Sequence, residues 1–181
     1  MKTALTQLYS YSELSEQAQV RALAKKAEQV DTDHLGDEMR ASLKAVCEAC
    51  SLRLTDWNFG AYCQDWKAKV TGSADDYQGN KALAWFLRVL MRHGYSRPSK
   101  FEELTFPGIC GFTGVCYDED VVETVWKSLL EGETVAEAFD QVAHTFSENW
   151  EREDDYQRTP EAILEYLDTS EEVYTEEGEE F

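Results

Sequence analysis

The sequence lacks any run of about 18 consecutive apolar residues, the minimum that a membrane-spanning helix needs. Residues 1–11 also lack the apolar stretch that is typical of a secretion signal. Both absences exclude a membrane-spanning class at the level of sequence. We therefore expect a protein of the cytoplasm that is not associated with a membrane.

Basic residues are scarce in the second part of the chain. Residues 102–181 contain three Lys and Arg against 24 Asp and Glu, whereas residues 1–101 contain 14 basic and 12 acidic residues, for a total net charge of −19. We predict a near-neutral half, 1–100, and a strongly acidic half, 101–181, within one compact unit. Such charge repels nucleic acid and anionic membranes, so it favours a basic protein surface as the partner.

Cysteine is present in an odd number, five, without a secretion signal, which favours reduced thiols over a disulfide framework. Cys47 and Cys50 have the spacing of a zinc-binding pair, but no second pair of this spacing exists. Both also fall on the apolar face of a predicted helix. We expect buried thiols, no metal and no cofactor, with structural zinc as the alternative.

Aromatic residues are abundant, with five Trp, eight Phe and nine Tyr, which excludes the composition of a disordered chain. Apolar periodicity predicts an α+β, mainly helical fold with about six helices and a small antiparallel β-hairpin. The predicted helices are 12–30, 37–52, 80–93, 118–132, 133–151 and 160–168, and the predicted strands are 52–59 and 66–71. The helix 80–93 is apolar nearly all round, so we expect it to be buried centrally.

The remaining segments give weaker predictions. Glycines and a proline in 101–117 predict an extended segment with turns, and the polar run 153–158 predicts a break before the last helix. The acidic end, 169–181, gives no element, although Val173, Tyr174 and Phe181 could dock as a short strand.

Carboxylates recur at helical spacing in the acidic half. Side chains three or four residues apart on a helix lie about 5–6 Å apart, and duplex DNA carries one charge per about 1.7 Å of its axis. A row of such carboxylates can therefore imitate a phosphate backbone, whereas the alternative is a solvated face that keeps the protein soluble. The candidate contact residues are Glu133, Glu137, Asp140, Glu148, Glu151, Glu153, Asp154 and Asp155.

Catalytic patterns are weak. Asp118, Asp120 and Glu123 could hold a divalent cation, although the same residues make an ordinary acidic helix start. The three histidines, His34, His93 and His144, form no zinc-protease pattern, and no nucleophile elbow is present. We predict a protein that is not an enzyme, with a metal-dependent enzyme as the alternative.

Several short segments resemble small acidic phage and prophage proteins, some of them described as antitoxins of a stability system. The segments are YSYSELSEQA at 9–18, LRLTDWNF at 52–59, CGFTGVCYDED at 110–120 and EYL at 165–167. A glycine-rich SGFSQGDG segment of many such proteins has no counterpart, and the resemblance assigns no catalytic residue.

The resemblance implies a protein of mobile elements that acts in the cytoplasm of a bacterial host. Its charge distribution is similar to that of DNA-mimicking inhibitors of restriction enzymes and of CRISPR effectors. The first hypothesis is thus an anti-restriction or anti-CRISPR inhibitor that binds a basic nucleic-acid-binding surface by its acidic half. The alternative is an antitoxin that covers a small partner toxin.

Overall fold

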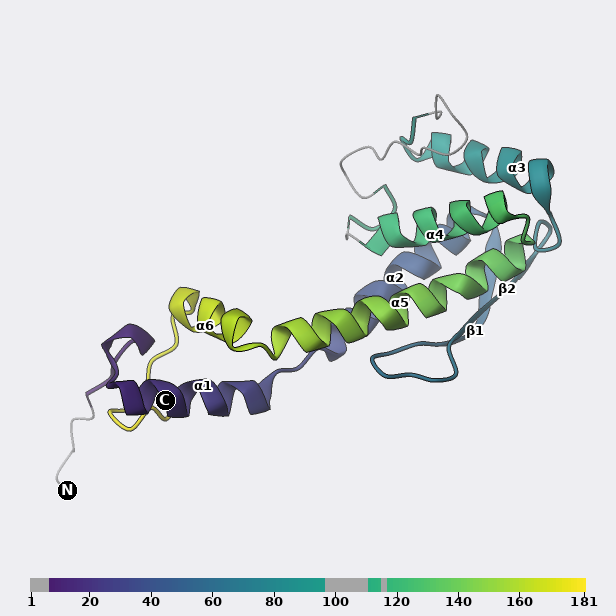
Figure 1. The fold of residues 1–181 in the computed structure, drawn as a ribbon. Helices are drawn as coiled ribbons and strands as arrows, with labels where there is room; N and C mark the ends of the chain where they lie inside the picture. The colour runs from purple at the N-terminus through teal and green to yellow at the C-terminus, as the bar shows by residue number, and fades with distance from the viewer. Residues whose placement is uncertain (1–6, 97–110, 115–116) are drawn as a thin grey trace, which may run out of the picture. The chain divides into compact units, whose positions relative to one another are not determined.

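The computed structural model describes residues 7–96, 111–114 and 117–181 (Figure 1). Its fold is α+β and mainly helical, with six α-helices and one two-stranded antiparallel sheet among these residues, as the sequence predicts. Most of the extended segment predicted at 101–117 lies outside the described residues. No described helix is both long and apolar enough to cross a membrane.

The chain forms two compact units, and their boundaries differ from the charge boundary near residue 101. The terminal unit combines 1–32 with 152–181, and the central unit comprises 33–151. By sequence, the terminal unit carries 16 acidic and six basic residues in 62 positions, and the central unit 20 acidic and 11 basic residues in 119. The net charges are thus −10 and −9, and the smaller unit has the denser negative charge.

The central unit surrounds the larger hydrophobic core. It contains α2 (Asp33–Ala49), β1 (Leu52–Asn58), β2 (Lys67–Gly72), α3 (Gly79–Arg92), α4 (Tyr117–Glu131) and most of α5 (Val135–Gln157). The apolar stripes of the helices meet in this core, which buries Phe86, Phe139 and Phe146 completely.

The hairpin formed by β1 and β2 is irregular. Leu54 pairs with Val70 and Trp57 with Ala68, but the register shifts between Leu54 and Asp56. Asn58, the last residue of β1, donates from its side-chain amide to the Asp65 carbonyl oxygen in the connecting loop over 2.6 Å. This hydrogen bond therefore links the end of β1 to the loop.

The helix α3 is amphipathic, which differs from the prediction of a helix buried all round. Figure 1 shows it alongside α4, and it buries Phe86 and Leu90, while Ala84 is exposed and Met91 is 51% exposed. The prediction of a helix buried all round was wrong because it counted alanine and methionine as apolar, although both also occur at a solvated helix face.

The helix α2 begins at Asp33, four residues before the predicted start at 37. The sequence prediction began this helix at Asp37 because the apolar residues at helical spacing begin at Met39. In the structure a Cβ atom at Gly36 would overlap the ring of Trp150 on α5. The absent side chain at Gly36 therefore makes room for the indole of Trp150.

The helix α5 extends to Gln157, six residues beyond the predicted end at 151. The polar run predicted as a break is instead helical as far as Gln157, and polar side chains in it bind one another across one turn. Arg158 binds Asp154 through Nε and one terminal nitrogen at 2.9 and 3.0 Å, and the Gln157 amide donates to Glu153 at 2.7 Å. Such pairs stabilise a helix without any apolar stripe.

The terminal unit packs α1 (Glu16–Gln29) against α6 (Pro160–Thr169), with a 3₁₀ turn at Tyr11–Glu13. Ser15 and Thr159 cap the two helices by accepting backbone N–H groups, as the sequence predicts for Thr159 and for one of two serines. The core of this unit comprises Tyr11, Leu14, Ala18, Ala22, Ile163, Leu167 and Tyr174.

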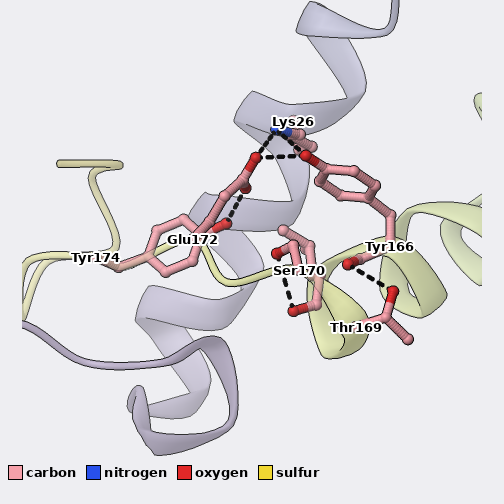
Figure 2. A network of polar contacts seen from close by, with 7 residues as sticks. Lys26, Tyr166, Thr169, Ser170, Glu172 and Tyr174 are labelled. Carbon is pink, nitrogen blue, oxygen red and sulfur yellow. Dashed lines mark hydrogen bonds and ion pairs between the residues drawn. The ribbon is translucent and has the colours of Figure 1, made fainter.

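The C-terminal segment, 170–181, docks onto α1 through Tyr174, which is 3% exposed and exchanges backbone hydrogen bonds with Tyr9. Glu172 accepts from Lys26 Nζ and from the Tyr166 hydroxyl, both at 2.5 Å, and from the Tyr174 hydroxyl at 2.7 Å. Figure 2 shows this group of contacts. Burial opposes the charge of Glu172, yet these hydrogen bonds lower its pKa. The predicted docking thus depends on Tyr174, whereas Phe181 is 76% exposed.

Candidate interaction surface

One face of α5 carries a straight row of ionisable side chains. Glu137, Asp140, His144, Glu148 and Glu151 follow one another at intervals of three or four residues, so a helix places them on one face. At 1.5 Å per residue the row is about 21 Å long. The four carboxylates are exposed and His144 is half-buried. We call these five residues the acidic stripe.

Hydrogen bonds hold two of the carboxylates in the acidic stripe, and a third lies beside His144. Glu137 accepts the backbone N–H and the hydroxyl of Thr134, both at 2.8 Å, and the backbone bond is the main reason that its pKa is lowered. Asp140 Oδ1 accepts the backbone N–H of Ala68 on β2 at 2.7 Å, and Glu148 lies 3.1 Å from Nε2 of His144. Glu137 and Asp140 are therefore held in place by hydrogen bonds to neighbouring residues.

The hairpin lies against the same helix. The Phe59 ring meets Phe146 edge-on with 5.2 Å between centroids, and the Gly60 N–H donates to the Ser147 hydroxyl at 3.2 Å. Trp66 stacks on His144 within the stripe, with 4.4 Å between ring centroids. An aromatic side chain thus lies beside the carboxylates.

Sequence reasoning did not assign Trp66 to the surface. Trp66 is the first residue of the predicted strand 66–71, but in the structure it lies just before β2 and is 42% exposed. The long-range stack on His144 has no local sequence signal, because the two residues are far apart in the chain.

Glu133 precedes α5 and is half-buried; one of its carboxylate oxygens is fully buried without a hydrogen-bond partner among the described residues. The structure therefore places Glu133 before α5, outside the acidic stripe.

The other three candidates belong to the terminal unit. Asp154 is 4% exposed and binds Arg158 and the hydroxyl of Thr32, the latter at 2.8 Å. Its carboxylate therefore makes contacts within the terminal unit and is not presented to a partner. Glu153 is half-buried and Asp155 is exposed. The structure brings together Glu137, Asp140, Glu148 and Glu151 on one surface of the central unit.

The three carboxylates of the alternative cation site have separate partners. Asp120 accepts from the Asn149 amide at 2.9 Å, and Glu123 pairs with Lys127 at 2.7 Å. Asp118 faces the loop at 111–114 instead. Within the described parts of the chain, no three His, Cys, Asp or Glu side chains gather as a metal site would require.

Asp118 is a fully buried carboxylate that organises a loop. It accepts the backbone N–H groups of Phe112 and Thr113 at 3.0 and 2.7 Å and the Thr113 hydroxyl at 2.7 Å. Burial alone would raise the pKa of Asp118, but these hydrogen bonds outweigh it and lower the pKa. Asp118 therefore ties the loop at 111–114 to the first turn of α4.

The thiols of Cys47 and Cys50 are buried in the core of the central unit. Burial, with a smaller contribution from Glu48, raises the pKa of Cys47 to about 12, and burial likewise raises the pKa of Cys50. Neither thiol is a thiolate at neutral pH, so neither is poised as a nucleophile.

Comparison with protein-family models, with curated proteins and with solved structures finds no match. The surface chemistry of the described residues therefore carries the functional proposal.

Proposed function

We propose that the protein is a non-enzymatic inhibitor of phage type that binds a basic nucleic-acid-binding surface of a bacterial defence complex by imitating DNA. The observation that carries this proposal is the acidic stripe, a straight row of exposed carboxylates on one helix of the central unit. The defence complex is of the restriction or CRISPR class.

The stripe has an energetic cost that binding would offset. Glu137 and Asp140, and likewise Glu148 and Glu151, are like charges three residues apart on a helix, and each such pair destabilises it by a few tenths of a kcal/mol. A basic groove built for phosphates would relieve this repulsion and release counterions, as it does with DNA.

The stripe is also pre-organised. The bonds from Thr134 to Glu137 and from Ala68 to Asp140 hold two of the carboxylates before any partner arrives. Less side-chain entropy is therefore lost on binding, which favours affinity for a groove of fixed spacing.

The experiment expresses the protein in bacteria that carry a restriction or CRISPR system and measures the plating efficiency of a phage that the system targets. The native protein should restore plating. A Glu148→Lys/Glu151→Lys variant should not, because both side chains are exposed and the substitutions reverse the charge at two of the four carboxylates of the stripe.

The matched control is a Glu48→Lys/Glu131→Lys variant, which changes the net charge equally at exposed positions of the same unit outside the stripe. It should inhibit as the native protein does. Equal loss of inhibition in both variants would show that the effect depends on total charge. Full inhibition by both variants would show that the acidic stripe has no role in the function. Thermal unfolding of each variant checks that the fold is intact.

An antitoxin remains the second candidate because the terminal unit exposes apolar side chains beside its charges. Leu164, Tyr166 and Val173 are all more than a third exposed. Together they offer apolar contacts to a small partner protein. Toxicity of a neighbouring gene product alone, and its loss on co-expression, would favour this candidate over the DNA mimic.

A further inference from the structure

Trp66 lies beside His144, the middle residue of the acidic stripe. Its ring stacks on His144 at a centroid distance of 4.4 Å with the planes 26° apart, and 42% of the residue stays exposed. His144 follows Asp140 by four residues and precedes Glu148 by four, so the helix places one carboxylate on each side of the stack. An exposed indole thus lies between two carboxylates.

The same hairpin shows which cation suits an indole. The guanidinium of Arg40 lies over the ring of Trp57, with its central carbon 4.4 Å from the centroid. A guanidinium is planar, weakly hydrated and able to stack on an aromatic ring while its N–H groups bind a carboxylate. A lysine ammonium is a strongly hydrated point charge and fits such a site less well.

We infer that Trp66, with Asp140 and Glu148 on either side, is the docking position for an arginine side chain of the basic partner. This inference rests on the proposed function and adds the residue type that the surface selects. The guanidinium stacks on the exposed part of the indole and donates to Glu148, replacing the contact with His144. Asp140 keeps its bond from Ala68 and attracts the cation with its second oxygen.

The experiment titrates the full chain with an oligo-arginine and an oligo-lysine peptide of equal length at one ionic strength. A cation–π contact at an exposed site corresponds to about a two- to fivefold difference in affinity, so the arginine peptide should bind tighter by about that factor. Trp66→Leu, which keeps apolar bulk, should abolish the difference, and Trp66→Phe, which keeps an aromatic ring, should retain most of it.

The matched control is Tyr156→Leu, which removes an exposed aromatic side chain of the terminal unit. It should leave the ratio of the two affinities unchanged. Should Trp66→Leu prove unstable, NMR of the native protein gives a second measurement. The indole N–H signal of Trp66 should then shift with the arginine peptide more than those of the other four tryptophans.

Equal affinity of the native protein for both peptides, a ratio that survives in Trp66→Leu, or an unmoved Trp66 signal would each overturn the arginine site. Binding of both peptides to Glu148→Lys/Glu151→Lys as tightly as to the native protein would instead overturn the role of the stripe. The failure of this inference and that of the proposed function are therefore distinguishable.

Discussion

Asp118 shows how one buried carboxylate closes a loop against a helix. Three donors from Phe112 and Thr113 converge on it, and its pKa is lowered despite burial. A lowered pKa in the folded state means that the ionised form stabilises the fold. That stabilisation is complete above the ordinary pKa of 3.8 and is lost as the pH falls through the lower folded value.

We predict that Asp118→Asn lowers the free energy of unfolding at neutral pH by about 1–3 kcal/mol, because buried N–H groups lose a charged acceptor. Denaturant titrations at neutral pH and at acid pH below 3.8 measure this. The difference between native protein and variant should shrink in acid. A difference that stays constant with pH would contradict the role of the charge.

At Gly36 we predict an effect on stability that is opposite to the one helix propensity alone would give. Glycine to alanine inside a helix normally stabilises by about 0.5–1 kcal/mol, but a Cβ at Gly36 would overlap the Trp150 ring. We expect Gly36→Ala to destabilise by about 1–3 kcal/mol. The added Trp150→Leu should relieve the overlap, so the two effects should not add in thermal unfolding; simple additivity would argue against the contact.

The sequence identified the helices through apolar periodicity and through caps such as Thr159, because these signals are local. Prediction from the sequence failed where contacts with residues on other elements determine the structure. Gly36 leaves room for Trp150, Trp66 stacks on His144, and the buried Asp154 binds Thr32 and Arg158, and all three contacts involve residues or elements that local sequence signals do not place together. The row from Glu137 to Glu151 was recognisable from spacing alone, since one helix carries all of it.

At the scale of elements, the C-terminal segment completes the core of the terminal unit. Tyr174 bridges to Tyr9 and lies in the core, and Gly178, with a φ of +84°, packs against the backbone of Ala18. A segment of high negative charge is thus ordered by one aromatic anchor and by pairs such as Lys26 with Glu172. The sequence named Tyr174 as one of three residues that could dock this segment, and the structure buries Tyr174 in the core.

We predict that Tyr174→Ala lowers the free energy of unfolding of the terminal unit by about 3–5 kcal/mol, as for other buried aromatic side chains. Hydrogen exchange should show loss of protection in α1 and α6. Phe181→Ala is the control, because Phe181 is largely exposed, and it should change little. Equal effects of the two substitutions would contradict the anchoring role of Tyr174.

At the scale of the whole molecule, negative charge is spread over both units although the sequence concentrates it after residue 101. The terminal unit joins 1–32 to the acidic end of the chain and still has a net charge of −10. This distribution could not be predicted, because the pairing of the two ends depends on contacts such as those of Tyr11 and Tyr174.

We predict that salt stabilises the isolated protein. The net charge of −19 opposes compaction, and salt shortens the range of this repulsion to about 10 Å at 0.1 M. A gain of about 1 kcal/mol corresponds to a rise in melting temperature of about 2–4 °C for a protein of this size. Sodium and potassium chloride should act alike, and a melting temperature that falls with either would refute self-repulsion.

Competition with DNA tests the central claim most directly. The measurement is the apparent Kd of the inhibited defence complex for its duplex DNA at increasing concentrations of this protein. Mimicry by the acidic stripe predicts that the apparent Kd rises in proportion to the protein concentration, and that Glu148→Lys/Glu151→Lys prevents the rise while Glu48→Lys/Glu131→Lys does not. A complex that binds DNA and this protein at the same time, with an unchanged Kd, would contradict it.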